Sequence, residues 1–444
     1  MAQHDKAGLD AYWLPFTSNR FFKKSPTILA SAKGAYYYTE EGQKLFDCLS
    51  GLWCCPLGHG HPKIAEVIAH QAKNLDYTTA FLAANPDAIK LAGRITSVAP
   101  KNLNKVFFTN SGSEAVDTAL KIAVGYHRIR GEGQRCRMIG RERGYHGVGF
   151  GGLSVGGMVA NRKMFSTVML PGVDHLPHTH NASEMAFSRG QPKWGAHLAN
   201  ELEKLVALHD ASTIAAVIVE PVAGSTGVLV PPIGYLERLR EICTAHGILL
   251  IFDEIITGFG RMGHYFGAQR FNVTPDMITF AKAVTNAVIP MGGVLVKNDI
   301  YETFMGIQAS EYAPEFFHGY TYSGHPMAAA VGNATFEIMR DEGLIEQARK
   351  LEPILEEAMH SLKGEESITD IRNIGLAAAI DLKPIAGKPG LRGFTIFQEA
   401  IKKGFLIRIA GDAIAVGPPF ISTKQELEDM AEVLRQVIRA VPAA

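Results

Sequence analysis

The sequence has few cysteines and no long apolar run. Its five cysteines include the adjacent residues Cys54 and Cys55 and follow no spacing that is typical of metal ligands. Adjacent cysteines rarely bridge, so we expect reduced thiols in a cytoplasmic protein. The chain also lacks a run of about 18 apolar residues, and it begins without the apolar core of a signal peptide. We therefore expect no membrane partner and no secretion.

The sequence also has no excess of basic or of acidic residues. The 44 Lys and Arg residues balance the 44 Asp and Glu residues, so the formal net charge is zero. This balance argues against nucleic acid as a partner. The basic cluster between Arg128 and Arg143 is interrupted by Glu132 and Glu142, which predicts a solvated face of the protein.

What is present is an ordinary globular composition, with 47% hydrophobic residues over 444 residues. The middle of the chain alternates short apolar runs with amphipathic segments, which is typical of a doubly wound α/β fold. We expect strands at 106–108, 248–252 and 277–281 and one ending at 220, with helices at 62–75, 196–207 and 235–246. A smaller α/β unit should follow the long helix that begins near Pro326.

Two charged residues stand at the ends of two apolar runs. Asp253 follows the run 248–252, and Lys282 follows the run 277–281. Ligands of open parallel sheets bind beyond the carboxyl ends of the strands, so both side chains could face one crevice. A lysine amine there could form a Schiff base with pyridoxal phosphate, and an aspartate could keep the pyridine nitrogen protonated. Taken singly, Asp253 could equally cap a helix and Lys282 could be a solvated lysine.

The surrounding stretch, GILLIFDEIITGFGRMGHYFGAQRFNVTPDMITFAKAVT at 247–285, closely resembles the signature of class III aminotransferases. These enzymes belong to the fold type I group of pyridoxal phosphate enzymes. The resemblance extends over nearly the whole chain and implies a large domain with a mostly parallel sheet flanked by helices, plus a smaller α/β domain. It also implies that Lys282 is the Schiff-base lysine and Asp253 the partner of the pyridinium nitrogen.

A second segment predicts an anion site. The turn 110–113 leads into an amphipathic helix whose first backbone N–H groups lack partners and attract negative charge. Ser111 or Ser113 could also serve simply as the N-cap. SGSEA at 111–115 matches the phosphate-binding segment of class III aminotransferases. The full cofactor site that the resemblance implies is Ser111, Gly112, Ser113, Tyr145, His146, Glu220, Asp253, Ile255, Lys282 and, from the neighbouring subunit of a homodimer, Thr321.

Substrate binding is also indicated by the resemblance. Arg408, which lies in a mostly apolar strand, could pair with a structural acid, but in the family an arginine at this place binds the substrate carboxylate. Relatives that act on ornithine or 4-aminobutyrate have a glutamine and a glutamate where this chain has Ala223 and Ser225. The substrate residues implied are Leu52, Trp53, Tyr145, Ala223 and Arg408.

These residues are most similar to the ω-amino acid:pyruvate branch, also called β-alanine:pyruvate transaminases. That branch implies a primary-amine donor, pyruvate as the keto-acid acceptor and ping-pong kinetics. A 4-aminobutyrate or taurine transaminase is the near alternative, and a pyridoxal phosphate aminomutase or decarboxylase is the farther one. The sequence leaves open whether homodimers pair into tetramers.

Three motifs could suggest other chemistry. Gly258, Gly260 and Gly263 spell GxGxxG, the motif of dinucleotide-dependent dehydrogenases, but no amphipathic helix follows them. His59 and His61 in GHGHP, and the histidines of HLPHTH at 175–180, lack acids at ligand spacing and favour turns or polar surface loops. We therefore expect no metal site.

We expect three segments. Residues 1–60 form an N-terminal arm that is part of the small domain, 61–320 form the large cofactor-binding domain, and 321–444 form the C-terminal small domain.

Overall fold

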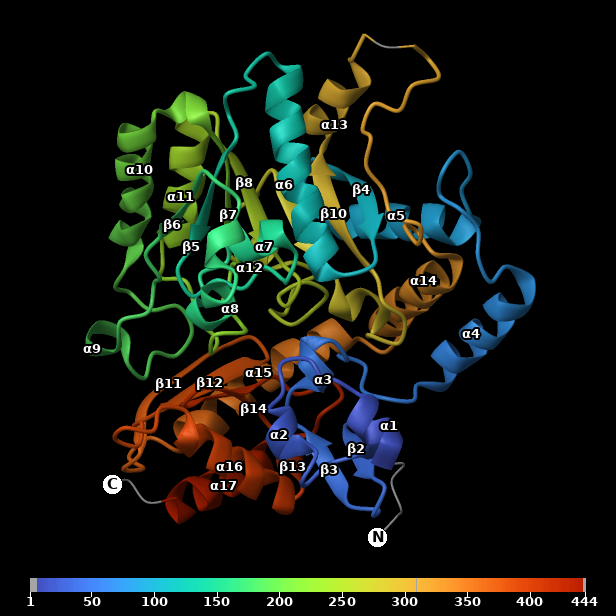
Figure 1. The fold of residues 1–444 in the computed structure, drawn as a ribbon. Helices are drawn as coiled ribbons and strands as arrows, with labels where there is room; N and C mark the ends of the chain where they lie inside the picture. The colour runs from blue at the N-terminus through green and yellow to red at the C-terminus, as the bar shows by residue number, and fades with distance from the viewer. Residues whose placement is uncertain (1–5, 309, 442–444) are drawn as a thin grey trace.

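The computed structural model describes residues 6–308 and 310–441. Residues 1–5 of the expected N-terminal arm and 442–444 of the expected C-terminal domain lie outside the described residues. Figure 1 shows a larger α/β body above a smaller one that contains both the first and the last segments of the chain.

The larger body is built on a seven-stranded sheet with the strand order β4-β10-β9-β8-β7-β5-β6. Strands β5 to β9 pair in parallel, and β10 runs antiparallel to both β4 and β9. The strands are β4 (Leu103–Thr109), β5 (Arg137–Arg141), β6 (Val173–Leu176), β7 (Ile214–Val219), β8 (Leu249–Asp253), β9 (Met277–Phe280) and β10 (Gly292–Lys297). The expected mostly parallel sheet is confirmed.

Both faces of this sheet are covered, which explains why its central strands are continuous apolar runs. In β8, Leu249 and Ile251 join the hydrophobic cluster formed with helix α6, whereas Leu250 and Phe252 join the cluster on the other face. The helices and 3₁₀ turns of this body are α4 (Pro62–Asn74), α5 (Pro86–Val98), α6 (Gly112–Ile129), α7 (Phe150–Val155), α8 (Val159–Lys163), η1 (Ser166–Val168), α9 (Ala182–Met185), η2 (Ala196–Asn200), α10 (Glu201–His209), η3 (Ala211–Thr213), α11 (Tyr235–Ala245), α12 (Gly267–Arg270), η4 (Lys282–Thr285), α13 (Asn298–Met305) and α14 (Pro326–Asp341).

The smaller body holds two four-stranded sheets, and one of them joins the two ends of the chain. Strand β3 pairs in parallel with β13, so that Phe46 lies opposite Phe405. The elements are α1 (Lys6–Ala11), α2 (Asn19–Phe22), β1 (Leu29–Lys33), β2 (Tyr36–Thr39), β3 (Lys44–Asp47), α3 (Ser50–Trp53), α15 (Leu344–His360), β11 (Ile368–Ile374), β12 (Ala377–Leu382), α16 (Leu391–Lys402), β13 (Phe405–Leu406), β14 (Arg408–Ala410), β15 (Ala413–Val416) and α17 (Lys424–Ala440).

The helices of the two bodies are also too short or too polar for a bilayer. Within residues 6–308 and 310–441, none of them combines the length and the hydrophobicity that crossing a membrane requires.

Candidate active site

Lys282 and Asp253 line the same small cavity at the ends of two adjacent strands. Asp253 is the last residue of β8, and Lys282 follows β9 after one residue. The two strands pair in parallel, so their carboxyl ends meet at one edge of the sheet, as the sequence predicts. The residues that line the cavity are Gly112, Ser113, Tyr145, Gly147, Glu220, Asp253, Ile255, Ile256, Ala281 and Lys282.

The Asp253 carboxylate is buried and held by two donors. Its Oδ2 lies 2.7 Å from Nδ1 of His146, and its Oδ1 accepts a hydrogen bond from the Ile255 backbone N–H at 3.2 Å. A carboxylate only accepts, so His146 carries a proton on Nδ1. His146 Nε2 is also buried and has no hydrogen-bond partner among the described residues. The site thus contains a fixed negative charge beside an unsatisfied ring nitrogen.

Lys282 occupies an unusual backbone conformation. Its φ is +53°, in the left-handed region that residues with a side chain rarely adopt. Such conformations persist where the surrounding structure imposes them, often at functional sites. Burial lowers the pKa of the Lys282 amine below its ordinary value, while the negative charges of Asp253 and Glu220 oppose this effect.

Glu220 is a third acid at a strand end and is buried beside the same cavity. Burial raises the pKa of its carboxyl to about 7. Its Oε1 accepts a hydrogen bond from the Tyr145 backbone N–H at 2.9 Å, which fixes the start of the segment that carries Tyr145 and His146. The Glu220 carbonyl accepts a hydrogen bond from Arg141 at 2.8 Å. Arg141 is buried, so the expectation that the whole basic cluster 128–143 is solvated is wrong for this residue.

The first turn of α6 forms another wall of the cavity. Ser111 is the N-cap, and its side chain accepts a hydrogen bond from the Glu114 N–H at 3.2 Å. Glycine at position 112 leaves room for the Ile255 side chain, whose Cδ1 would lie 2.6 Å from a Cβ there. Ser113 Oγ accepts the Val148 N–H at 3.1 Å and lines the cavity. The N-terminal end of an 18-residue helix therefore faces the cavity with a favourable dipole for an anion.

Pyridoxal phosphate fits this set of residues. The cavity brings together an amine that can condense with an aldehyde, a helix N-terminus that can bind a phosphate, and a buried carboxylate that can pair with a protonated ring nitrogen. The partnerless Nε2 of His146 adds an unsatisfied polar atom behind Asp253, which a purely structural cluster would be expected to satisfy.

The expected substrate residues lie mostly outside this cavity. Leu52 is exposed, and Arg408 is exposed at the start of β14. Ala223 is buried in a loop, where its N–H donates to the Leu229 carbonyl. Tyr145 is the one member of this set that also lines the Lys282 cavity.

Trp53 belongs to the interior of the smaller body. It is buried, its ring lies 5.6 Å from the Arg261 guanidinium, and it fills the space that a side chain at position 417 would need. Of the two environments that the sequence allows for Trp53, a pocket wall or the core, the structure shows the core.

Thr321 also lies outside the cavity of its own chain. It is exposed, and its carbonyl accepts a hydrogen bond from the Tyr77 hydroxyl at 3.0 Å. Its expected contact with the cofactor of a neighbouring subunit stays a prediction.

Three cavity residues were not anticipated from the sequence: Gly147, Ile256 and Ala281. Gly147 has a φ of +90°, and a Cβ on it would lie 2.5 Å from Ser113 Oγ. Its place in the glycine-rich run after His146 was a usable signal. The competing GxGxxG motif, by contrast, forms turns, and the helix α12 that follows it has only four residues.

The histidine motifs have structural partners. His59 bonds Asp47 at 2.9 Å, and His61 bonds Glu342 at 3.0 Å. Within the described ranges, His180 forms a group of three possible metal ligands with Asp370 and Asp381.

Both carboxylates of that group already bind Arg372. Its Nη1 lies 2.7 Å from Asp370 Oδ2 and 2.8 Å from Asp381 Oδ2. Burial would raise the pKa of Asp381, but hydrogen bonds from His180 and Arg372 hold it well below its ordinary value. The guanidinium supplies the positive charge that a metal ion would bring. The acids come from β11 and β12, which is why spacing around His180 did not predict them.

Comparisons with known proteins agree over almost the whole chain. The family model "Aminotransferase class-III" matches residues 18–438. An ω-aminotransferase of Caulobacter vibrioides is 54% identical over 98% of both chains. A β-alanine–pyruvate aminotransferase of Pseudomonas aeruginosa is 48% identical over 98% of this chain and 96% of its own length.

Solved structures match equally well. The ω-transaminase of Pseudomonas jessenii in complex with PMP is 30% identical, with a TM-score of 0.91 over 98% of this chain and 97% of that chain. A transaminase of the marine bacterium Virgibacillus gives a TM-score of 0.88 at 31% identity over 98% of each chain. These matches confirm the expected fold type I architecture. The chain therefore belongs to the class III aminotransferases, whose cofactor is pyridoxal 5′-phosphate.

Proposed function

We propose that this aminotransferase moves an amino group from an ω-amino acid such as β-alanine, or from another primary amine, to pyruvate. The observation that carries the proposal is the meeting of Lys282, Asp253 and the start of α6 around one cavity. The names of the relatives that are 48–54% identical supply the substrate class. The product pair would be alanine and an aldehyde or ketone.

Lys282 is proposed to act both as the attachment point of the cofactor and as the general base. When bound, pyridoxal phosphate supplies an aldehyde that condenses with amines and a ring that accepts the electrons released when the proton beside the nitrogen leaves. Lys282 Nζ would be placed to remove that proton and to hold it for return, as a general base and acid. Because burial lowers the Lys282 pKa, a larger share of the amine is uncharged, as a base must be.

The acids have separate proposed roles. Asp253 would stabilise a protonated ring nitrogen through its charge, since it is buried and its orientation is fixed by His146 and Ile255. The proposed role of Glu220 is less direct: its carboxyl accepts the Tyr145 N–H and so holds the segment whose Tyr145 ring is proposed to stack on the cofactor. Ser111, Gly112 and Ser113 would hold the phosphate.

The substrate side is proposed to use Arg408. No ion pair of Arg408 is found among the described residues, and a guanidinium can clamp two carboxylate oxygens at once. Ala223 and Ser225 stand where the resemblance places a glutamine and a glutamate in relatives that act on ornithine or 4-aminobutyrate, so this loop offers no carboxylate that could neutralise the arginine. The pocket is therefore proposed to differ from that of 4-aminobutyrate transaminases, although relatives named γ-aminobutyrate transaminases are 32% identical to this chain.

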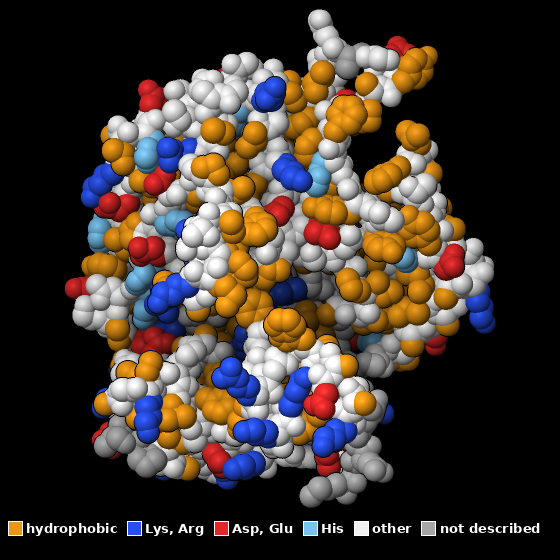
Figure 2. All heavy atoms as spheres, in the orientation of Figure 1, with side chains coloured by type: hydrophobic (Ala, Val, Ile, Leu, Met, Phe, Trp, Pro, Cys, Tyr) orange, Lys and Arg blue, Asp and Glu red, His pale blue; other side chains and the backbone are white. Residues whose placement is uncertain are grey.

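We further propose a homodimer with shared active sites. Exposed aromatic and aliphatic side chains gather on the side of the molecule where α4 and α5 lie (Figure 2). Tyr77 and Tyr322 make an edge contact with ring centroids 6.0 Å apart, and Phe81 and Phe317 are also exposed nearby. Large exposed apolar patches are typical of interfaces. Thr321 lies within this patch, as its expected contact with a partner's cofactor would require.

We also propose a division of the chain into domains and a location in the cell. The expected small domain of residues 1–60 and 321–444 is supported by the pairing of β3 with β13, but α14 (Pro326–Asp341) packs on α4 and α5 of the larger body, so we propose that the small domain resumes after α14. A cytoplasmic location is supported by the five cysteines, which are free thiols in the described structure.

The visible spectrum of the purified protein tests the proposal. The band of the lysine-linked cofactor should bleach on addition of β-alanine and return on addition of pyruvate. If the band is present but neither compound changes it, the proposed cofactor site stands and the proposed substrates are wrong. Replacing pyruvate by 2-oxoglutarate separates this function from a 4-aminobutyrate transaminase that uses that acceptor.

A further inference from the structure

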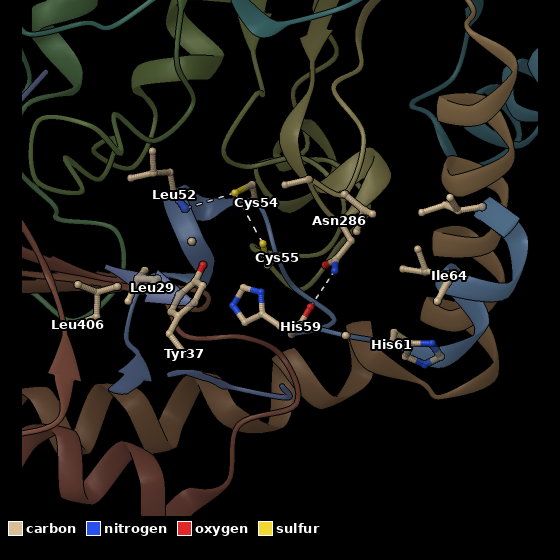
Figure 3. A pocket seen from close by; sticks show the side chains of 17 residues that line it. Leu29, Tyr37, Leu52, Cys54, Cys55, His59, His61, Ile64, Asn286 and Leu406 are labelled. Atoms are coloured by element: carbon tan, nitrogen blue, oxygen red, sulfur yellow. Dashed lines mark hydrogen bonds between the residues drawn. The ribbon is translucent and has the colours of Figure 1, made fainter. Parts of the chain in front are cut away.

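Two cysteines that are neighbours in the sequence line one cavity near the turn that carries Lys282. Cys54 and Cys55 line a cavity of about 630 Å³ together with Tyr37, Leu52, His59 and Asn286. Figure 3 marks a hydrogen bond between the two sulfurs with a dashed line. Cys54 is partly exposed and Cys55 is buried, so a small reagent in the cavity meets Cys54 first.

The geometry leaves no side chain between the sulfurs. Their Sγ atoms are 3.9 Å apart. Gly51 has a φ of +66°, and a Cβ on it would lie 3.1 Å from Cys54 Sγ and 3.3 Å from Cys55 Sγ. Glycine at this place therefore leaves open the small space toward which both thiols point.

The two thiols differ in their electrostatic environment. The contact between the two sulfurs lowers the pKa of Cys54, and the Leu52 N–H at 3.3 Å and the charge of Lys282 act in the same direction. When protonated, the Cys54 S–H can donate to the Ser50 carbonyl at 3.5 Å. The contact between the two sulfurs and burial raise the pKa of Cys55, so that its proton is retained. Thiolates react with electrophiles and oxidants, and protonated buried thiols do not. Cys54 is the nucleophile of the pair.

The thiol-bearing loop is tied to the turn that carries Lys282. Asn286 Oδ1 accepts the Leu57 N–H at 3.0 Å, and Asn286 Nδ2 donates to the Gly58 carbonyl at 2.8 Å. Asn286 lies four residues after Lys282, at the end of η4. A change in the backbone near Cys54 is therefore transmitted toward the lysine, and Leu52 and Trp53 lie on the same loop.

We propose that Cys54 and Cys55 form a peroxide-sensitive thiol site that reversibly inactivates the enzyme. The Cys54 thiolate attacks the terminal oxygen of a hydroperoxide, the O–O bond breaks, and the alkoxide or hydroxide leaves and takes a proton from water, which gives a sulfenic acid on Cys54. The Cys55 sulfur then attacks the Cys54 sulfur, the S–O bond breaks, and water leaves with the Cys55 proton. One hydroperoxide is reduced, and two thiols are oxidised to one disulfide.

Closing this bond must reshape the loop. The sulfurs have to move from 3.9 Å to about 2.05 Å apart, which removes Cys54 from the Leu52 N–H. Adjacent Cα atoms are only about 3.8 Å apart, below the usual range for a disulfide. A strained bond of this kind is readily reduced, which makes the change reversible. The inactivation rests on the proposed transaminase function, whereas the oxidation itself does not.

The test uses the holoenzyme with hydrogen peroxide, peptide mapping by mass spectrometry and turnover of β-alanine with pyruvate. The peptide with Cys54 and Cys55 should lose about 2 Da, and kcat/KM should fall about tenfold and recover with dithiothreitol. In Cys55→Ser, the same peptide should gain about 16 Da at Cys54 and react with dimedone. Cys54→Ser should keep its activity under peroxide, and Cys136→Ser, which removes an exposed thiol elsewhere, should behave like the wild type.

Two results would overturn the proposal. One is inactivation of Cys54→Ser at the wild-type rate, and the other is oxidation of the wild type that maps to Cys136 and leaves Cys54 and Cys55 reduced. An enzyme that never turns over these substrates but still loses about 2 Da at the Cys54–Cys55 peptide would refute the proposed substrates and keep the thiol chemistry.

Discussion

Nδ1 of His146 lies 2.7 Å from Oδ2 of Asp253, and both side chains are buried. The histidine thus orients the carboxylate, and its own Nε2 has no partner among the described residues. Burying a charged pair is costly, and buried pairs of titratable groups that line a cavity are concentrated at functional sites. The pair links β8 to the segment that follows β5.

Asp253→Asn should lower the rate of amine oxidation by about 10²-fold or more while the cofactor stays bound. The amide keeps the shape of the side chain but loses the charge that stabilises a protonated ring nitrogen. Single-turnover kinetics with β-alanine, together with the cofactor content per subunit, measure the two effects separately. Near-normal rates would contradict the electrostatic role of Asp253.

Lys282→Ala should abolish turnover without unfolding the protein. Its side chain supplies the cofactor link and the general base, and its loss removes both. Lys101→Ala, which removes an exposed lysine on the surface, is the control and should be fully active. Circular dichroism checks the fold of both variants. Retained transamination in Lys282→Ala would refute the proposed mechanism.

Arg408→Ala should raise the KM for pyruvate and for β-alanine by about 10 to 100-fold, the range expected for a lost charged hydrogen bond. The KM for an aryl amine without a carboxylate should change far less. Arg408→Lys should be intermediate, because it keeps the charge and loses the planar fork. Arg128→Ala, at an exposed arginine on α6, is the control. Equal losses for all three substrates would count against a carboxylate clamp.

Local signals in the sequence were enough to predict the centre of the site. The apolar runs before Asp253 and Lys282 are short and continuous, so both strands and their ends could be located. Because β8 and β9 pair in parallel, the end of one strand brings its acid close to the lysine that follows the other. Strands β8 and β9 follow one another in the chain and are also neighbours in the sheet.

Contacts between distant segments could not be predicted in this way. Trp53 is buried because Gly417 and Arg261, far away in the sequence, leave a space for its ring. Arg372 bonds acids of its own sheet and also donates to the Gly227 carbonyl at 2.7 Å, in the loop that begins at Ala223. Neither set of partners leaves a periodic or short-range pattern in the sequence.

Gly147→Ala should weaken cofactor binding about tenfold and destabilise the protein by about 1–3 kcal/mol, since a side chain is strained at this backbone conformation. The added Cβ would also lie 2.5 Å from Ser113 Oγ and 2.7 Å from Ser113 Cα, at the first turn of α6. Gly133→Ala is the matched control, because a Cβ at that exposed glycine meets no described atom within 4 Å. Cofactor titration and thermal unfolding measure the two effects. A Gly147→Ala variant with unchanged affinity would contradict the proposed phosphate site.

Glu220→Gln should change how the stability of the cofactor-free protein depends on pH. Burial raises the pKa of Glu220 to about 7, above its ordinary value of 4.5. Between these values the unfolded chain has lost a proton that the folded chain keeps, so this group's contribution to stability is complete below pH 4.5 and is lost as the pH rises toward 7. The loss amounts to about 3 kcal/mol at most.

Glu220→Gln should therefore show a flatter decline of the urea midpoint between pH 5 and pH 7 than the wild type. Glu302→Gln, at an exposed glutamate of α13, should keep the wild-type slope, and identical slopes for all three proteins would show that Glu220 is ionised in the folded state.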